Sequence, residues 1–193
     1  MGPVAFPRRR TRFGLGALAR GCYYDAMAVR HVLQLGDPLL RAVSKPVPPD
    51  DAAAILQDLE ETLTEFRRGH GFGRAISAIQ IGQAVRVIFL QLGGLRYELI
   101  NPEITWFGPD TFTLWDDCFS FPNLLVRLER RRALRLRYQS PSGAARELEA
   151  FGALSELIQH EMDHLDGVLA VDRALDRDSL CTREEWLRRY RSE

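Results

Sequence analysis

The sequence predicts an α+β fold in which mostly antiparallel sheets pack around a central helix that carries an HExxH motif. An amphipathic helix precedes the sheets, and a short helix follows them. Apolar residues recur at helical spacing over residues 50–69 and again over residues 152–167, and short apolar or alternating runs lie between. This order of helix, strands and helix favours sheets whose neighbouring strands run antiparallel.

The first helix is expected to begin at two acidic caps, Asp50 and Asp51, and to end at Gly69. Its apolar residues share one face and would pack against a core: Ile55, Leu56, Leu59, Leu63 and Phe66. The pattern therefore predicts an amphipathic helix with one buried side.

Three strands are predicted from short runs, "VRVIFLQL" (85–92), "YELINPEI" (97–104) and "ALRLRY" (133–138). In the last run, Leu134, Leu136 and Tyr138 alternate with arginines that point outward. We expect the basic residues of this region to form a solvated strand face: Arg127, Arg130, Arg131, Arg132, Arg135 and Arg137. Contact with RNA is an alternative use of these arginines.

Helical spacing returns from Gly152, with Leu154, Leu157, Ile158 and Leu165 on one side, and ends at Gly167. This is the predicted central, mostly buried helix. Further on, Thr182 and Glu185 have the spacing of a capping box and predict a short terminal helix.

The length of 193 residues and the 46% of hydrophobic residues are enough for one core, so we expect one domain over residues 27–193. Residues 1–26 are expected to be an N-terminal extension of uncertain origin, because they are rich in arginine, contain only Asp25 as an acid and precede a natural start at Met27. An organellar leader is the alternative.

The formal net charge of zero argues against DNA and membrane surfaces as partners and favours a small acceptor as substrate. No apolar run approaches the length of a membrane span, and no secretory signal is recognisable. The three cysteines, Cys22, Cys118 and Cys181, are odd in number and widely spaced, which is typical of a reducing compartment. We therefore expect a soluble, intracellular protein with a cytoplasmic location.

The segment "QHEMDHLDG" (159–167) predicts a metal site. His160 and His164 lie on one helix face, about one turn or ~5.4 Å apart, and Glu161 lies beside them. A divalent metal that hydrolyses amides usually takes three protein ligands and leaves a position for water. A third ligand must therefore come from elsewhere in the chain.

Three kinds of third ligand can be compared. A metzincin would need a histidine where Ala170 stands, which excludes that class. A gluzincin would use a glutamate near Glu184, although an acid in the first turn of a helix is more often a surface residue. Cys118 in "WDDCFSFP" offers a thiolate, although a lone cysteine is more often a small buried hydrophobe. The residue pattern alone leaves Cys118 and Glu184 open.

The segments "GRAISAIQIG" (73–82), "WDDCFSFP" (115–122) and "QHEMDHLDG" (159–167) together resemble, in order and spacing, the three signature segments of the peptide deformylases. The resemblance spans roughly residues 28–175. It implies that Cys118 is the third metal ligand, with water as the fourth. It also implies one divalent metal ion per chain, ferrous iron in the cell, with zinc, nickel or cobalt able to substitute.

The implied reaction is removal of the N-formyl group from the initiator methionine of N-formylmethionyl nascent peptides, with release of formate during protein biosynthesis. Glu161 would act as general base and then general acid. The side-chain amide of Gln80 and the backbone N–H of Phe119 would stabilise the developing oxyanion. A related metalloamidase or metallopeptidase and a catalytically silent paralogue remain as alternative functions.

The sequence departs from the family pattern at the implied substrate-binding positions, which are Gly73, Arg74, Ala75, Asp117 and Glu156. Ala75 and Asp117 replace glycines, and Arg74 replaces an apolar residue that would border the methionine pocket. We hypothesise that Arg74 and Glu156 pair across the pocket and either narrow it or favour a polar substrate side chain. In the alternative, Arg74 points to solvent.

Overall fold

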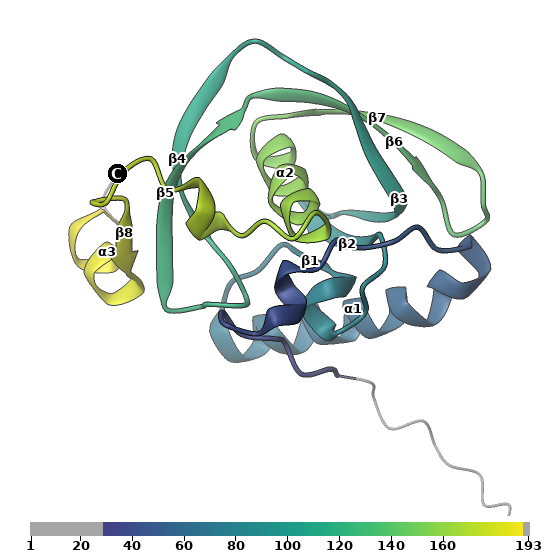
Figure 1. Cartoon of the computed structure of the whole chain (residues 1–193), viewed down its shortest axis with the longest axis horizontal. Helices are drawn as coiled ribbons and strands as arrows, with labels where there is room; N and C mark the ends of the chain where they lie inside the picture. Colours follow the sequence, from purple (N-terminus) through teal and green to yellow (C-terminus); the bar gives the residue numbers. More distant parts are fainter. Residues whose placement is uncertain (1–28, 191–193) are drawn as a thin grey trace, which may run out of the picture.

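The computed structural model describes residues 29–190, in which two antiparallel sheets enclose a central helix (Figure 1). The first sheet has the order β1-β2-β3-β6-β7, and its strands are Ala75–Ser77, Val87–Leu92, Leu95–Phe107, Ala133–Gln139 and Ala145–Phe151. The second has the order β4-β5-β8, and its strands are Thr111–Asp117, Leu124–Arg131 and Leu180–Thr182. The helices are α1 (Pro49–His70), α2 (Ala153–Leu165) and α3 (Arg183–Arg189). The predicted α+β class is confirmed.

Helix α1 is amphipathic as predicted, but both of its predicted ends are wrong. Pro48 is the N-cap, and Asp50 and Asp51 lie in the first turn, where negative charge favours the helix dipole. The helix passes Gly69 and ends at His70, because Gly71 adopts the left-handed conformation (φ 76°) and donates its N–H to the carbonyl of Arg67.

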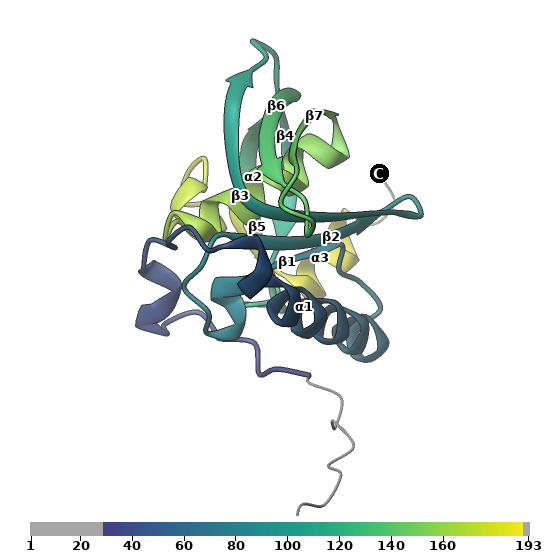
Figure 2. The same ribbon diagram turned by 90° about the vertical axis from the view of Figure 1, so that its right-hand side faces the viewer.

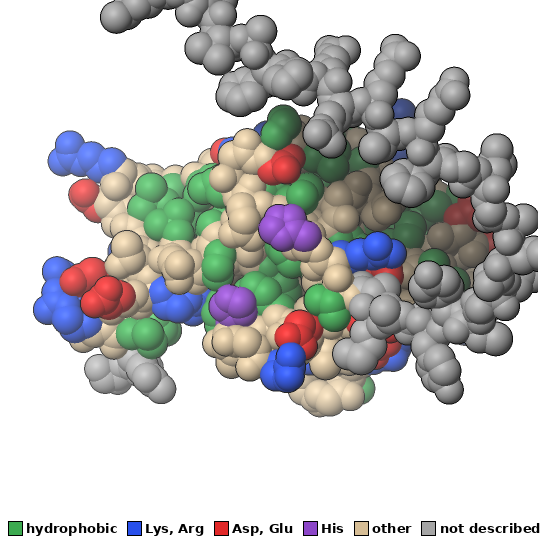
Figure 3. All heavy atoms as spheres, turned by 90° about the horizontal axis from the view of Figure 1, so that it is seen from below, with side chains coloured by type: hydrophobic (Ala, Val, Ile, Leu, Met, Phe, Trp, Pro, Cys, Tyr) green, Lys and Arg blue, Asp and Glu red, His purple; other side chains and the backbone are tan. Residues whose placement is uncertain are grey.

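The buried face of α1 packs on the first sheet. Leu56, Leu59 and Leu63 belong to a core cluster with Ile76 of β1 and Phe89 of β2. Figure 2 shows α1 running beneath β1 and β2. Seen from below, the described surface intersperses basic and acidic side chains with small apolar groups (Figure 3).

The three predicted strands are confirmed as β2, part of β3, and β6. In β6, Leu134 and Leu136 are buried, and Arg135 and Arg137 are exposed, as predicted. Strand β3 pairs with β2 along its first half and with β6 along its second, and its register shifts after Ile100. It therefore bends from one half of the sheet into the other (Figure 2).

The prediction of a solvated arginine face is wrong for Arg130. In β5, Val126, Leu128 and Arg130 lie on the same side of the strand because side chains alternate, and all three are buried. The other arginines of this group on β5 and β6 are exposed: Arg127, Arg131, Arg135 and Arg137.

Helix α2 begins after Gly152 and lies between the two sheets (Figure 1), so every residue from Ser155 to Leu165 is buried. After it, Gly167 has φ 73°, and a Cβ there would lie 2.5 Å from the carbonyl oxygen of Arg41. This close approach admits only glycine.

Helix α3 has half of the predicted capping box. The Thr182 hydroxyl accepts the backbone N–H of Glu185 at 3.3 Å, whereas the Glu185 carboxylate binds Arg188 and Arg189. Within residues 29–190, no helix has the length and apolar character needed to cross a membrane. The predicted extension, residues 1–26, lies outside the described residues.

Candidate metal centre

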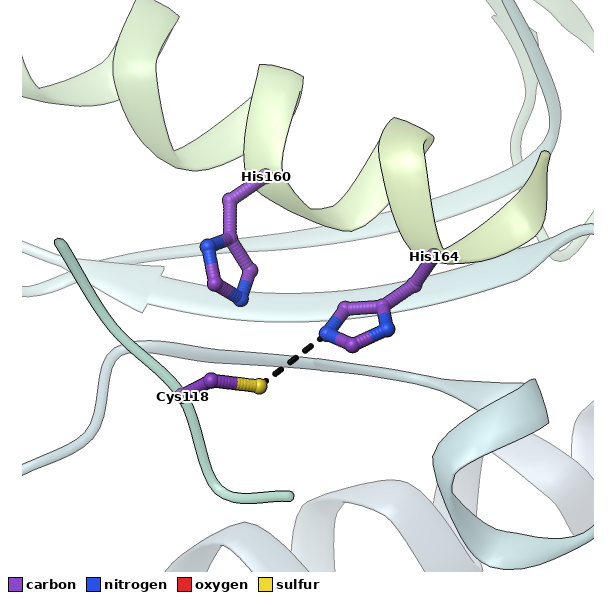
Figure 4. Close-up of side chains that lie close together, drawn as sticks. All are labelled: Cys118, His160 and His164. Carbon is purple, nitrogen blue, oxygen red and sulfur yellow. Dashed lines mark hydrogen bonds between the residues drawn. The ribbon is translucent and has the colours of Figure 1, made fainter. Parts of the chain in front are cut away.

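Helix α2 presents His160 and His164 on one face, with ring centroids 5.0 Å apart and planes inclined by 66°. Cys118 follows β4 and points at the same place from the second sheet (Figure 4). Its Sγ lies 3.2 Å from Nε2 of His164, although 46 positions separate the two residues in the chain. The fold thus brings the residue that follows β4 into contact with a histidine of α2.

The donor atoms of Cys118, His160 and His164 all lie within 4.8 Å of one another, and the three side chains are buried. A thiolate with two imidazoles is a donor set that suits zinc or ferrous iron. The three donor atoms are close enough for one ion to be shared among them. These residues therefore fit the divalent metal that the sequence predicts.

Asp116 orients the ring of His160. Its Oδ2 lies 2.9 Å from Nδ1 of His160 and accepts a second hydrogen bond from Nη2 of Arg130 at 3.1 Å. Burial alone would raise the pKa of Asp116, but His160 and Arg130 together lower it to about 2, so the carboxylate is charged. The Nδ1 atom must then be the donor, which leaves Nε2 of His160 for a metal ion.

The surroundings shift the pKa values of the two histidines in opposite directions. Burial would lower the pKa of His160, but the Asp116 carboxylate outweighs it and raises this pKa well above its usual value. For His164, burial and then the neighbouring His160 lower the pKa well below its usual value. His164 therefore offers a neutral imidazole to a metal ion, whereas His160 has to lose a proton when a metal ion binds.

Arg130 extends this network to Asp163, three residues after His160 on α2. Its Nη1 lies 2.5 Å from Oδ2 of Asp163, and its side chain is 2% exposed. Arg173 binds the same Asp163 carboxylate. Sequence reasoning placed Arg130 on the surface and did not find this role; the alternation of Val126 and Leu128 with exposed neighbours was the signal that it pointed inward.

Glu161 lies next to His160 on α2 and is 2% exposed. Burial raises the pKa of its carboxyl group to about 7, although the positive charge of His160 and a hydrogen bond from Ser77 act in the opposite direction. Its Oε2 atom has no hydrogen-bond partner among the described residues. A carboxyl group in this state can take up and release a proton near neutral pH.

Gln80 is held in a short 3-10 helix, Ala78–Ile81, directly after β1. Its Oε1 accepts hydrogen bonds from the N–H of Ser77 at 2.9 Å and from the Ser77 hydroxyl at 3.1 Å. The amide nitrogen therefore faces Cys118, 3.6 Å from Sγ. In residues 29–190, no backbone acceptor or side chain takes the N–H of Phe119, the other predicted donor.

A cavity of about 340 Å³ opens beside the cluster, and all five predicted substrate-binding residues line it: Gly73, Arg74, Ala75, Asp117 and Glu156. Cys118, His160 and Glu161 line it as well. Gly73 has φ 121°, and a Cβ there would lie 2.4 Å from Cζ of Phe119. Gly73 is thus required both by its backbone conformation and by the aromatic ring.

Arg74 and Glu156 form an ion pair in the lining of this cavity. Nη2 of Arg74 lies 3.0 Å from one carboxylate oxygen of Glu156 and 3.3 Å from the other. The Glu156 side chain is 3% exposed and that of Arg74 is 40% exposed. Arg74 therefore remains in contact with solvent while it is bound to Glu156.

Asp117 is held by α3, a contact that sequence reasoning missed. Its carboxylate lies 2.7 Å from Nη2 of Arg183, and Nε of Arg183 lies 2.6 Å from the carbonyl oxygen of Pro122. The same guanidinium lies 3.8 Å above the ring of Phe72, another residue of the cavity wall. Nothing in the local sequence indicates this pairing, because 66 positions separate Asp117 and Arg183.

Glu184, the alternative third ligand, lies in the first turn of α3 and is exposed. Among the described residues, the cluster able to hold a metal consists of Cys118, His160 and His164.

Comparison with known proteins gives a consistent match. A family model described as polypeptide deformylase matches residues 29–179. The chain is 38% identical over 153 residues to a peptide deformylase of Bartonella tribocorum, an alignment that covers 76% of this chain and 84% of that protein. The crystal structure of a Thermotoga maritima peptide deformylase superposes with a TM-score of 0.72 at 31% identity and covers 77% of this chain and 99% of that one. The structure of a Synechococcus elongatus peptide deformylase in complex with actinonin superposes with a TM-score of 0.73 at 29% identity. This match covers 86% of this chain and 90% of that one.

Proposed function

The chain belongs to the polypeptide deformylase family of metal-dependent hydrolases, and from this premise we propose how its residues remove the formyl group from formylated peptides. The substrate is the N-formylmethionyl end of a nascent polypeptide, and the products are formate and a free amine. The observation that carries the proposal is the convergence of Cys118, His160 and His164 in one cluster, beside the cavity that Glu161 lines.

Cys118, His160 and His164 would hold one divalent ion, which we propose is ferrous iron in the cell, with zinc, nickel or cobalt as substitutes. When bound, such an ion supplies Lewis acidity and makes water a competent nucleophile near neutral pH. Asp116 keeps the ring of His160 in the orientation that this requires.

Glu161 would take the proton of the attacking water and pass it to the leaving amine. The pKa of about 7 suits this exchange, because the carboxyl group is then neither a strong acid nor a strong base at neutral pH. A positioned acid–base group of this kind contributes roughly 10²- to 10⁴-fold to the rate.

The Nε2 atom of Gln80 and the backbone N–H of Phe119 would donate to the developing oxyanion. Ser77 holds the amide of Gln80 so that Nε2 lies 3.6 Å from Sγ of Cys118 and 3.4 Å from Oγ of Ser120, at the metal cluster. Each preorganised donor of this kind is worth roughly 10²- to 10³-fold in the rate. Gly73, Arg74, Ala75, Asp117 and Glu156 would contact the peptide itself.

The cellular setting is the remaining part of the proposal. We place the protein in the bacterial cytoplasm, where it would meet formylated chains during synthesis. The exposed arginines Arg131, Arg135 and Arg137 offer a weak, transient contact with the ribosome. DNA and membranes are not proposed as partners.

The direct test is formate release from formyl-Met-Ala-Ser by iron-loaded protein. Glu161→Ala should retain the metal and lose roughly 10²-fold or more of kcat. Cys118→Ser should lose the metal, whereas Glu184→Ala should leave metal content and formate release unchanged. The opposite behaviour of the last two variants would favour a gluzincin-like peptidase, and no formate from any substrate length would indicate a silent paralogue.

A further inference from the structure

The cavity beside Cys118 is lined in part by two chain segments that belong to different sheets. The loop between α1 and β1 contributes Phe72 and Gly73, and the end of β4 with the residues after it contributes Asp117 and Phe119. The two segments meet edge to face, with the ring centroids of Phe72 and Phe119 6.4 Å apart. The shape of the cavity therefore depends on how these segments are held relative to each other.

Arg183, the first residue of α3, contacts both segments. The Cζ atom of its guanidinium lies 3.8 Å from the centroid of the Phe72 ring. Its Nη2 atom donates to Oδ2 of Asp117 at 2.7 Å, and its Nε atom donates to the carbonyl oxygen of Pro122 at 2.6 Å. One side chain thus joins the cavity wall of the first sheet to that of the second.

The backbone of Arg183 is fixed as well. Its N–H group donates to the carbonyl oxygen of Asn123 at 2.8 Å, and the preceding residue, Thr182, pairs with Leu124 of β5. The side chain of Arg183 is only 22% exposed. Both β8 and α3 follow residue 179, where the match to the family model ends. A segment beyond the matched residues therefore supplies a fixed guanidinium to the cavity wall.

Arg183 also balances the charge of Asp117. Three further carboxyl groups line the cavity, those of Asp116, Glu156 and Glu161. The hydrogen bond from Arg183 ties the Asp117 carboxylate to a cation of α3. Without that bond the carboxylate would be free to turn into the space that a peptide has to enter, and its charge would add to that of its neighbours.

Within residues 29–190, the contacts of Arg183 are with the cavity wall and the chain beside it, and none is with a reacting group. The ring of His160 is oriented separately by Asp116, and the amide of Gln80 by Ser77. Loss of Arg183 should therefore change how tightly a peptide binds, and not how fast the bound peptide reacts.

We propose that Arg183 is a positioning residue for the substrate: it holds Phe72 and Asp117 in place, and the formylated peptide binds to the wall that these residues form. Helix α3 is then part of the peptide-binding site, although no residue of α3 lines the cavity. The inference rests on the proposed deformylase function and adds a residue that governs substrate affinity.

Formate release from formyl-Met-Ala-Ser separates the effect on KM from the effect on kcat. Arg183→Met keeps a long side chain over Phe72 but loses the hydrogen bonds to Asp117 and Pro122, so KM should rise roughly tenfold while kcat stays within about twofold. Arg183→Lys retains the charge without the planar fork, so its KM should lie between the two. Arg188→Met removes an exposed arginine of the same helix and should leave both constants unchanged.

A double variant tests whether Arg183 acts through Asp117. Asp117→Asn/Arg183→Met should raise KM no further than Arg183→Met does alone, because the contact between the two side chains is already lost. Metal content and the midpoint of urea denaturation are measured for every variant. Both should match those of the unaltered protein, so that the change in KM reports on peptide binding.

An unchanged KM in Arg183→Met, a fall in kcat that accounts for the whole loss, or effects that multiply in the double variant would overturn the proposal. If Arg183→Met does not fold, KM in Arg183→Lys and Asp117→Asn decides by the same comparison. If the unaltered protein releases no formate, the proposed function fails instead. Calorimetry of formyl-Met-Ala-Ser with the metal-loaded proteins then decides: binding roughly tenfold weaker in Arg183→Met supports the proposal, and equal or absent binding overturns it.

Discussion

The Nδ1 atom of His160 lies 2.9 Å from Oδ2 of Asp116, and this contact determines which nitrogen of the ring faces Cys118. Asp116 is in turn bound by the buried Arg130, which also binds Asp163. The histidine of the proposed metal site is therefore oriented by charged residues of β4, β5 and α2 acting together.

Asp116→Asn should weaken metal binding. The amide carries no charge and only weakly favours the donor state of Nδ1 of His160, so we expect a loss of roughly 10- to 100-fold in metal affinity. Competition with a chelator measures this metal affinity. Asp110→Asn, in the exposed turn before β4, is the control and should bind as tightly as the unaltered protein; equal affinity in both variants would show that Asp116 does not orient the ligand.

Arg130→Met should destabilise the whole fold. It leaves the carboxylates of Asp116 and Asp163 in a buried region without their shared partner, which typically costs roughly 3–5 kcal/mol in the free energy of unfolding. Arg137→Met removes an arginine that is 59% exposed and should change the free energy of unfolding little. Urea denaturation of both variants is the measurement, and similar midpoints would contradict the assignment of Arg130 as a buried bridge.

Gly73→Ala should reduce both stability and activity. The new Cβ would meet the ring of Phe119, whose far side stacks on Phe66 with centroids 3.7 Å apart, so the backbone that carries the Phe119 N–H must shift. Gly93→Ala places alanine at φ 60°, within the left-handed region, and in open space, so it carries only a milder backbone strain of about 1–2 kcal/mol. Formate release should fall at least tenfold more in the first variant than in the second. Equal losses would mean that the contact with Phe119 is unimportant.

The contribution of Glu161 to the stability of the metal-free protein should fall as the pH rises from about 4.5 to about 7, whereas the lowered pKa of His164 acts in the opposite direction. The folded state raises the pKa of Glu161 to about 7, so the folded state binds the proton more tightly than the unfolded chain does. The stability that this group contributes is full below about pH 4.5 and is lost as the pH passes 7, roughly 3 kcal/mol in all. Urea denaturation at pH 5 and pH 8 measures the change.

Glu161→Gln should remove this component, because the amide does not ionise, so the unaltered protein should lose more stability between pH 5 and pH 8 than the variant does. Glu129→Gln, at an exposed position of β5, should show the same pH dependence of stability as the unaltered protein. The same slope in all three proteins would contradict the burial of an ionisable group at position 161.

Local patterns were sufficient to predict the elements that depend on nearby residues. Helical spacing found α1 and α2, and apolar alternation found β2, β3 and β6. The ends of α1 were missed because the acidic residues at its start favour the first turn as well as the cap, and because Gly69 and Gly71 are equally good candidates for its end. The strands β1 and β8 are only three residues long and depend on pairing with distant partners.

The residues of the site also fall into two groups, those that the sequence identified and those that depend on distant partners. His160, Glu161 and His164 follow from one helical motif, and the resemblance to the family identified Cys118 and Gln80. Arg130 and Arg183 could not be found in this way, because each acts through a carboxylate that is distant in the chain. Charge composition alone gives every arginine the same prior expectation of exposure.

The most direct test of the metal centre is the absorption spectrum of the cobalt-substituted protein. A sulfur ligand gives an intense charge-transfer band in the near ultraviolet, so we predict this band in the unaltered protein and in Glu184→Ala, and its loss in Cys118→Ser. Stoichiometric cobalt binding without the band, or a band that survives in Cys118→Ser, would show that the sulfur of Cys118 does not bind the ion.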